Sequence, residues 1–166
     1  MAQKFLLNVF LTISLFYLTG YAQEEDNLQK IVSYHNMHGG STFDVNSGEN
    51  YKDIDAYAVA IFPDYGTSFE GKYITVEDLE SFLVITDFIY NSRNESNLLA
   101  NNFWSSRNYL VGSWYDEENS QTWIEVTRLI FDLEEAMKTA RQYDQRYIYH
   151  LRTGKTIKVK PSIDNQ

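Results

Sequence analysis

Two helix-start signals divide the chain into three stretches of strand character. Thr75 precedes two acidic residues, and Asp132 is followed three residues later by Glu135. A hydroxyl or carboxylate at such a position accepts hydrogen bonds from the free amides of a first helical turn, and nearby acids favour the positive end of the helix dipole. Apolar residues then recur at helical spacing, so the sequence predicts helices over 75–90 and 132–143.

Short strand-like segments bounded by turn-forming residues fill most of the remaining sequence. The predicted strands cover residues 42–44, 56–62, 109–115, 122–127, 147–151 and 155–159. Hairpins separated by helices are typical of an antiparallel sheet with its helices packed on one face. We therefore expect a two-layer α+β domain, with an antiparallel sheet of about five to six strands built from hairpins and two main helices on one face.

The chain shows no internal repeat and no interdomain linker, so we expect a single domain over 39–160. A chain of this size can form one full hydrophobic core. Residues 23–38 are expected to be a short leader with weak helical spacing, and residues 161–166 a tail. The Asn- and Ser-rich residues 91–108 are expected to form a long loop pinned by its aromatic side chains.

The first 22 residues are typical of a cleaved secretory signal. Lys4 precedes an apolar run over 5–18, and Gly20 and Ala22 place small residues where a signal peptidase cuts. A membrane anchor is the alternative, but a spanning helix needs about 20 apolar residues. This run is shorter and contains polar residues. We therefore expect cleavage of residues 1–22 and export of the mature chain.

The chain contains no cysteine. Disulfides therefore contribute nothing to its stability, and no lipid-modified cysteine can anchor it. The 10 Phe, 13 Tyr and 3 Trp supply the apolar area for a core that packing alone must hold together. Because exported proteins without cysteine are commonest in bacteria, we expect a periplasmic or secreted bacterial protein.

Acidic residues outnumber basic ones by 23 to 14, which gives a net charge of −9. Loss of Lys4 with the signal makes the mature chain one unit more negative. Nucleic acids and anionic lipids attract proteins through Lys and Arg patches, so they repel such a chain. We expect a basic protein partner, no nucleic-acid binding and no membrane span after signal cleavage, although acidity that serves only solubility is the simpler alternative.

Two histidines form the candidate catalytic group. His35 and His38 lie beside the pair Gly39–Gly40, where imidazoles could act as base or electrophile while the glycines let backbone amides approach a substrate. Asp44 is the candidate carboxylate partner, and the alternative is that both histidines are ordinary loop residues. The segment 44–48 has the oxygen donors of a calcium loop but lacks its later Glu, so it favours a turn. We expect no metal and no cofactor.

The candidate binding residues are acidic and aromatic. Asp116, Glu117 and Glu118 join two predicted strands and could dock Arg or Lys side chains of a partner, or form a solvated hairpin tip. Trp114 and Trp123 lie on those two strands. They could form a stacking surface for a sugar or a peptide, although large aromatic side chains more often belong to the core.

Several short blocks resemble a known domain. They are His38-Gly39-Gly40-Ser41-Thr42-Phe43-Asp44, Thr75-Val76-Glu77-Asp78-Leu79, Gly112-Ser113-Trp114-Tyr115-Asp116, Thr122-Trp123-Ile124-Glu125-Val126 and Leu151-Arg152-Thr153-Gly154-Lys155-Thr156-Ile157. In this order, over roughly 39–157, they are similar to an uncharacterised small α+β domain of large multidomain (polyvalent) proteins from bacterial phages and mobile elements. The resemblance implies a fold and a mobile-element or bacterial-conflict context, with no established activity. This chain differs in its expected signal peptide and in a longer stretch over 85–108.

Binding is favoured over catalysis because the chain contains no specific catalytic motif such as Gly-x-Ser-x-Gly. We expect an exported small binding protein, of immunity or inhibitor type or a mobile-element accessory protein, that recognises a basic partner. One alternative is a small secreted hydrolase that uses a His and carboxylate site in the loop 35–40. A second alternative is glycan binding through exposed aromatic side chains.

Overall fold

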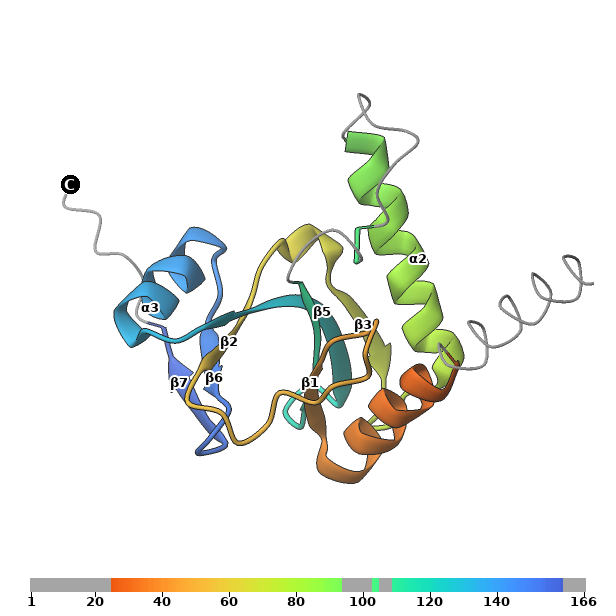
Figure 1. Ribbon diagram of the computed structural model, residues 1–166, viewed down its shortest axis with the longest axis horizontal. Helices are drawn as coiled ribbons and strands as arrows, with labels where there is room; N and C mark the ends of the chain where they lie inside the picture. The colour runs from red at the N-terminus through yellow and green to blue at the C-terminus, as the bar shows by residue number, and fades with distance from the viewer. Residues whose placement is uncertain (1–24, 94–102, 105–108, 160–166) are drawn as a thin grey trace, which may run out of the picture.

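The structure is a computed structural model that describes residues 25–93, 103–104 and 109–159 (Figure 1). Its elements in chain order are β1 (Gly40–Phe43), β2 (Tyr57–Ala60), the 3-10 turn η1 (Pro63–Tyr65), β3 (Thr67–Glu70), α2 (Val76–Arg93), β4 (Leu110–Asp116), β5 (Gln121–Ile130), α3 (Leu133–Gln142), β6 (Tyr147–His150) and β7 (Lys155–Lys158). Residues 25–38 are also helical. The strands form one antiparallel sheet in the order β1-β4-β5-β2-β6-β7, and β3 pairs with β5.

The long strand β5 organises the sheet. β4 pairs along one side of it, while β3 and β2 lie end to end along the other side. Between these two partners η1 forms a bulge, in which residues 61–66 lie opposite only Glu125 and Val126. Phe62 enters the bulge with a φ of 55°, in the left-handed region, and its ring packs against three tyrosine rings. A bulky residue with such a backbone persists only where its surroundings hold it, as these rings do.

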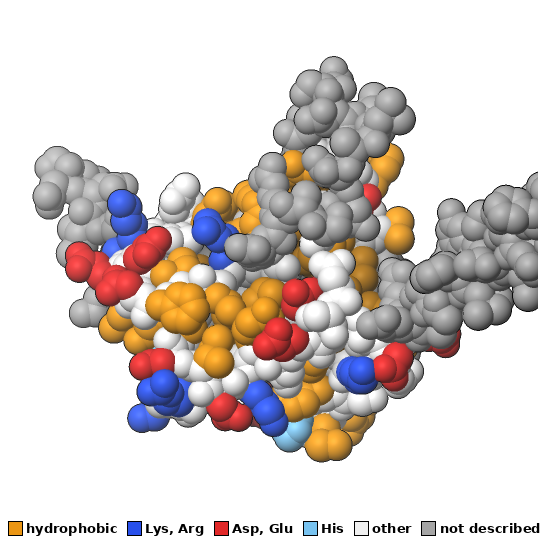
Figure 2. Space-filling model, in the orientation of Figure 1, with side chains coloured by type: hydrophobic (Ala, Val, Ile, Leu, Met, Phe, Trp, Pro, Cys, Tyr) orange, Lys and Arg blue, Asp and Glu red, His pale blue; other side chains and the backbone are white. Residues whose placement is uncertain are grey.

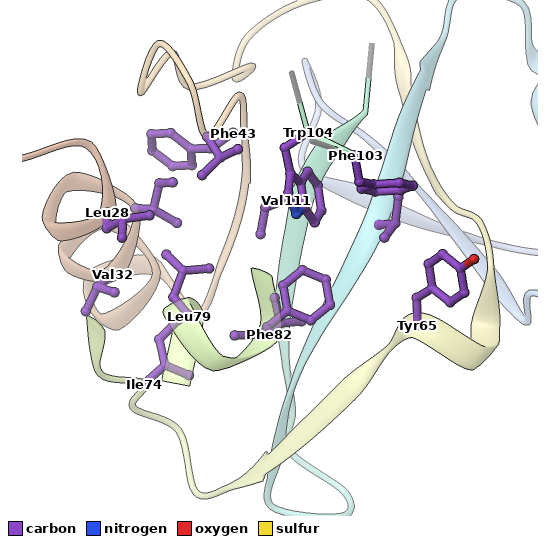
Figure 3. Close-up of a cluster of buried hydrophobic side chains, with 14 of the residues drawn as sticks. Leu28, Val32, Phe43, Tyr65, Ile74, Leu79, Phe82, Phe103, Trp104 and Val111 are labelled. Atoms are coloured by element: carbon purple, nitrogen blue, oxygen red, sulfur yellow. The ribbon is translucent and has the colours of Figure 1, made fainter. Parts of the chain in front are cut away.

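The larger of two hydrophobic clusters lies between the sheet, α2 and the helical residues 25–38. In Figure 3, Leu28 and Val32 lie close to Leu79 of α2, and Phe82 lies farther along, on the side of Trp104. The buried members of this main core are Leu28, Ile31, Val32, Phe43, Val45, Ile61, Tyr65, Ile74, Leu79, Phe82, Phe103, Trp104, Val111, Ile124 and Val126. Each fully buried large side chain stabilises the fold by about 1.5–3 kcal/mol, so this cluster holds both helices on the sheet.

A second, smaller cluster lies at the other end of the sheet, where α3 packs on β2 and β6. Its buried members are Val59, Ile130, Ala136, Ala140, Ile148 and Val159. The strand β5 contributes to both clusters, and Arg128, which lies between its two contributions, is exposed. The sheet therefore supports two separate cores along one strand.

Both predicted helix starts are confirmed. The Asp78 amide donates to Thr75 Oγ1 at 3.1 Å, and the Thr75 amide donates back to Asp78 Oδ2 at 2.8 Å. At α3 the Glu135 amide donates to Asp132 Oδ1 at 2.8 Å. Such caps stabilise a helix by about 1 kcal/mol each, which is why the two signals were readable without tertiary information.

The α+β class and the antiparallel sheet are also confirmed. The structure differs from the expectation in two places. Residues 25–38, expected as a leader, form a helix whose Ile31 and His35 are fully buried in the protein. The strand β3 was not predicted, because Pro63 and the glycine that follows η1 are typical of a strand end and here instead belong to a bulge within a longer pairing.

Several sequence predictions fall on residues outside the described ranges. The expected signal peptide over 1–22 and tail over 161–166 lie there entirely, so the cleaved signal stays a prediction. Of the expected loop 91–108, residues 91–93 belong to α2 and residues 103–104 are buried, while the others lie outside the described residues. In the part of the chain that the structure describes, no helix is long and apolar enough to cross a membrane.

Candidate functional site

One of the two candidate catalytic histidines, His35, lies inside the protein with no exposed surface. Its Nε2 lies 3.1 Å from the carbonyl oxygen of Lys72, and its Nδ1 lies 2.9 Å from Ser113 Oγ. Burial lowers the pKa of His35, so the ring is neutral. A carbonyl only accepts, so Nε2 carries the proton and Nδ1 accepts from Ser113. Ser113 Oγ in turn accepts from Ser41 Oγ at 2.6 Å.

This chain of hydrogen bonds connects the helical residues 25–38 to β4 and to the segment that precedes α2. Every polar atom in it has a partner, as buried polar groups require. The imidazole is fully engaged by Ser113 and Lys72, and the hydroxyl nearest to it is itself only 6% exposed. The arrangement is that of a structural anchor for the N-terminal helix.

The other two predicted catalytic residues have separate local contacts. The His38 ring packs against Tyr34 with centroids 4.2 Å apart and the ring planes tilted by 37°. Asp44 Oδ1 accepts from the backbone amide of Asn46 at 2.8 Å, which is the contact of a polar side chain that closes a turn. Among the described residues, no hydrogen bond or ion pair joins His35, His38 or Asp44 to one another. The geometry gives these three residues no common site.

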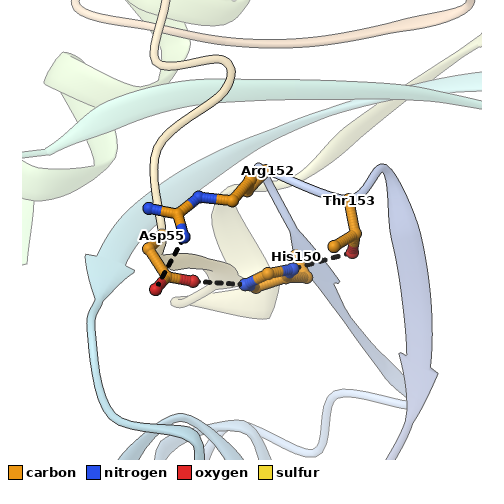
Figure 4. A network of polar contacts seen from close by, with 4 residues as sticks. All are labelled: Asp55, His150, Arg152 and Thr153. Carbon is orange, nitrogen blue, oxygen red and sulfur yellow. Dashed lines mark hydrogen bonds and ion pairs between the residues drawn. The ribbon is translucent and has the colours of Figure 1, made fainter.

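A further polar network brings together residues that the sequence had not singled out (Figure 4). His150 Nδ1 lies 2.7 Å from Thr153 Oγ1, and His150 Nε2 lies 3.1 Å from Asp55 Oδ1. Arg152 Nη1 lies 3.1 Å from the second oxygen of Asp55. A carboxylate, an imidazole and a hydroxyl in line can activate a nucleophile. Here the hydroxyl belongs to the same hairpin turn as the histidine and Arg152 pairs with the carboxylate, so the network ties the hairpin β6–β7 to the segment before β2.

The predicted binding residues, in contrast, do converge. Trp114 and Trp123 are direct partners in the pairing of β4 with β5, so they lie side by side on the same face of the sheet. The turn between the same two strands carries Asp116, Glu117 and Glu118. By the alternation of β5, Trp123 lies on the face opposite to Ile124 and Val126, which belong to the main core.

The acidic tip of this hairpin is ordered by its own hydrogen bonds. Asp116 Oδ1 accepts from the amides of Glu118 and Asn119, and its Oδ2 accepts from the Asn119 side chain at 2.7 Å. The hydrogen bond from the Asn119 side chain is the main reason that the pKa of Asp116 is lowered. Asp116 therefore stays ionised, and the exposed Glu117 and Glu118 add two further negative charges beside it.

A fourth carboxylate, Glu125, lies beside Trp114 and Trp123. It was not predicted from the sequence. The indole Nε1–H of Trp114 donates to Glu125 Oε2 at 3.0 Å. The Trp114 side chain is 41% exposed, while Glu125 is half-buried. Burial raises the pKa of Glu125, and the hydrogen bond from Trp114 opposes that rise. We call the surface formed by Trp114, Trp123, Glu125 and the tip 116–118 the Trp114 face.

Two glycines lie beside Trp114 and Glu125 in the sheet. Gly40 lies opposite Trp114 on β1, and Gly112 lies opposite Glu125 on β4. At Gly112 an added Cβ would overlap the side chain of Thr127. The Thr127 side chain therefore fills the space above Gly112, and a larger residue at this position would displace it.

In the described ranges, no three His, Asp or Glu side chains converge closely enough to hold a metal ion. Comparison with protein-family models, with characterised proteins and with solved structures finds no match for the chain. The resemblance to the domain of phage polyvalent proteins therefore stays a prediction. Any functional assignment rests on the geometry of the Trp114 face.

Proposed function

We propose that the protein binds a basic protein partner through the Trp114 face, with a Lys or Arg side chain of the partner against Trp114 and Glu125. The observation that carries the proposal is the hydrogen bond between the exposed indole and the half-buried carboxylate. It fixes a carboxyl group beside an aromatic ring at the protein surface. We further propose that the protein is exported and acts as an immunity-type, inhibitor-type or mobile-element accessory protein, and that its mature chain begins at Gln23.

The energetics of the Trp114 face favour a cationic ligand. A cation over an indole ring gains about 0.5–2 kcal/mol, and a hydrogen bond to a charged group gains about 1.5–3 kcal/mol. The free protein holds Glu125 where burial disfavours its charge. A bound Lys or Arg would pair with the carboxylate and offset the cost of burying its charge, which would favour binding. The tip 116–118 would increase the association rate, because surface charge steers an oppositely charged partner.

The hydrolase alternative has less support, because His35 is fully engaged by Ser113 and Lys72, and among the described residues no hydrogen bond joins His38 to Asp44. Glycan binding shares one requirement with the proposal, an exposed ring on which a sugar could stack. It does not require the charge of Glu125. Replacing the Glu125 carboxylate by the neutral amide of Gln therefore distinguishes the two hypotheses, because it should weaken the binding of a cation and leave the binding of a glycan unchanged.

The proposal is tested with a peptide of alternating Lys and Ser, which offers cations without apolar side chains. We expect Trp114→Ala to weaken its binding at least about 10-fold and Glu125→Gln about 5-fold, in line with the interaction energies above. Glu134→Gln, which removes an exposed acid on α3, is the matched control and should leave the affinity unchanged. Isothermal titration at low and high salt provides the affinities.

Equal affinity of the wild type, Trp114→Ala and Glu125→Gln for the Lys–Ser peptide would sink the proposal. Binding of a soluble oligosaccharide that is lost in Trp114→Ala and kept in Glu125→Gln would replace it by glycan recognition. Export is checked by amino-terminal sequencing of protein from the envelope or culture fluid, where a sequence that still begins at Met1 would contradict it.

A further inference from the structure

We propose that the outer face of α2 is a second interface, which binds an apolar segment flanked by Lys or Arg from another protein. This inference is independent of the Trp114 face. α2 carries apolar side chains on two faces: Leu79 and Phe82 are fully buried against the sheet, whereas Val84, Ile85 and Phe88 are 68%, 46% and 72% exposed. Figure 2 shows hydrophobic side chains along the edge of α2 that faces away from the sheet.

The three exposed residues form one continuous strip. Val84 and Phe88 are four residues apart, so they are neighbours on the helix surface, and Ile85 lies beside both. Single exposed apolar residues are ordinary on a protein surface, whereas a contiguous group marks an interaction site. A helix that is apolar on both sides is normally buried on both sides, and here only one side is covered by the described residues.

The charges next to the strip define what would cover it. Glu77 and Glu80 are exposed in the first turns of α2, and Glu80 lies four residues before Val84. Among the described residues neither glutamate has an ion-pair partner. The other two acids of α2 are already engaged, since Asp78 caps the helix and Asp87 accepts from the amide of Phe103 at 2.6 Å. A partner would therefore meet an apolar strip that ends in two available carboxylates.

This charge pattern selects against two other occupants. A second copy of the chain would bring its own acidic helix and a net charge of −9 to a surface that is already negative. An anionic membrane would be repelled for the same reason. An amphipathic segment with apolar residues at a spacing of three and four, and with Lys or Arg at one end, complements both the strip and the two glutamates.

The test uses two helical peptides of 14 residues with Leu at the same positions, one with Lys and the other with Glu at all remaining positions. We expect the Leu–Lys peptide to bind and to shift the amide NMR signals of residues 84–88. Phe88→Ser should weaken binding at least about 10-fold, the factor that corresponds to about 1.4 kcal/mol. Replacing Glu77 and Glu80 together by Gln should weaken it two- to five-fold. Phe131→Ser, which changes another aromatic side chain that is 74% exposed, is the matched control and should have no effect.

The Leu–Lys peptide could also reach the Trp114 face, so the titration is repeated in Trp114→Ala, where the shifts at 84–88 should persist. Equal binding of the Leu–Glu peptide, or unchanged affinity in Phe88→Ser, would overturn the proposal. So would a dimer in sedimentation equilibrium that Phe88→Ser dissociates, because a second copy would then be the occupant. Binding to phosphatidylglycerol vesicles that Phe88→Ser abolishes would assign the strip to a membrane instead. Circular dichroism of each variant establishes that it is folded.

Discussion

His35 and Glu125 are both ionisable groups with restricted access to water, but their surroundings differ. His35 is fully buried, neutral and bonded at both ring nitrogens. Glu125 is half-buried beside an exposed ring, and the indole N–H of that ring donates a hydrogen bond to it. Burial disfavours the charged form of each group. The fully buried and bonded group is typical of structure, and the half-buried carboxyl group beside an exposed ring is where a ligand could bind.

The largest effect expected from this comparison is on stability, through His35. His35→Ala would leave a cavity and remove the partner of Ser113 Oγ and of the Lys72 carbonyl, so we expect a loss of about 3 kcal/mol in the free energy of unfolding. Urea denaturation measures it. His38→Ala, in the same helix but exposed, is the control and should change the value by less than about 0.5 kcal/mol. A loss below about 1 kcal/mol for His35→Ala would contradict the role of this residue as an anchor.

The second effect is a difference in the sign of the pH dependence. Because the pKa of His35 is lowered in the folded protein, the unfolded chain binds this proton more tightly. The free energy of unfolding therefore falls as the pH falls below about 6.5. The raised pKa of Glu125 acts in reverse, because the folded protein binds this proton more tightly than the unfolded chain does, so the destabilisation disappears as the pH falls through the folded pKa toward the unfolded value. Glu125→Gln should therefore raise the free energy of unfolding at pH 7.

Urea denaturation of the wild type and Glu125→Gln at a series of pH values tests this difference. The gain of the variant should shrink as the pH approaches about 4.3, the ordinary pKa of a glutamate. A variant that is less stable than the wild type at pH 7 would show that the carboxylate stabilises the fold. That result would remove the energetic argument for a cationic ligand.

The smallest expected effect is a change in the pKa of Glu125 when its hydrogen bond from Trp114 is removed. Trp114→Phe keeps an aromatic ring but removes the indole N–H that donates to Glu125 Oε2. Since this hydrogen bond favours the carboxylate, its loss should raise the pKa of Glu125 further. Titration of the Glu125 side-chain carbonyl carbon by 13C NMR in the wild type and in Trp114→Phe measures the change. An unchanged or lower pKa would mean that the hydrogen bond does not hold in solution.

Local signals in the sequence were sufficient for most of the elements. The caps at Thr75 and Asp132 act within one helical turn, and the predicted strands of the hairpins β4–β5 and β6–β7 are joined by short turns. The bulge between β2 and β3 could not be predicted in the same way. It exists because both strands pair with β5, which lies more than 50 residues further along the chain.

The same distinction between local and long-range contacts applies to the candidate site. Trp114 and Trp123 were singled out as aromatic side chains and the tip 116–118 as a run of acids, and their closeness follows from the short turn that joins their strands. Glu125 was missed, although it lies two residues after Trp123 and so shares its face of the strand. Its contact with Trp114 depends on strand register, which composition and spacing do not specify. His35 was misassigned to a reactive loop because its burial depends on Ser113, which is 78 residues away.

The division of the hydrophobic interior into two clusters along β5 has a consequence for how the molecule opens. Cooperative opening units often coincide with supersecondary motifs, and the unit formed by α3, β2, β6 and β7 depends on the smaller cluster. It can exchange its amide hydrogens with solvent through a local opening that leaves the larger cluster intact. The Trp114 face and the outer face of α2 both belong to the larger part. A ligand at either would slow exchange there and leave the α3 unit to open at its own rate.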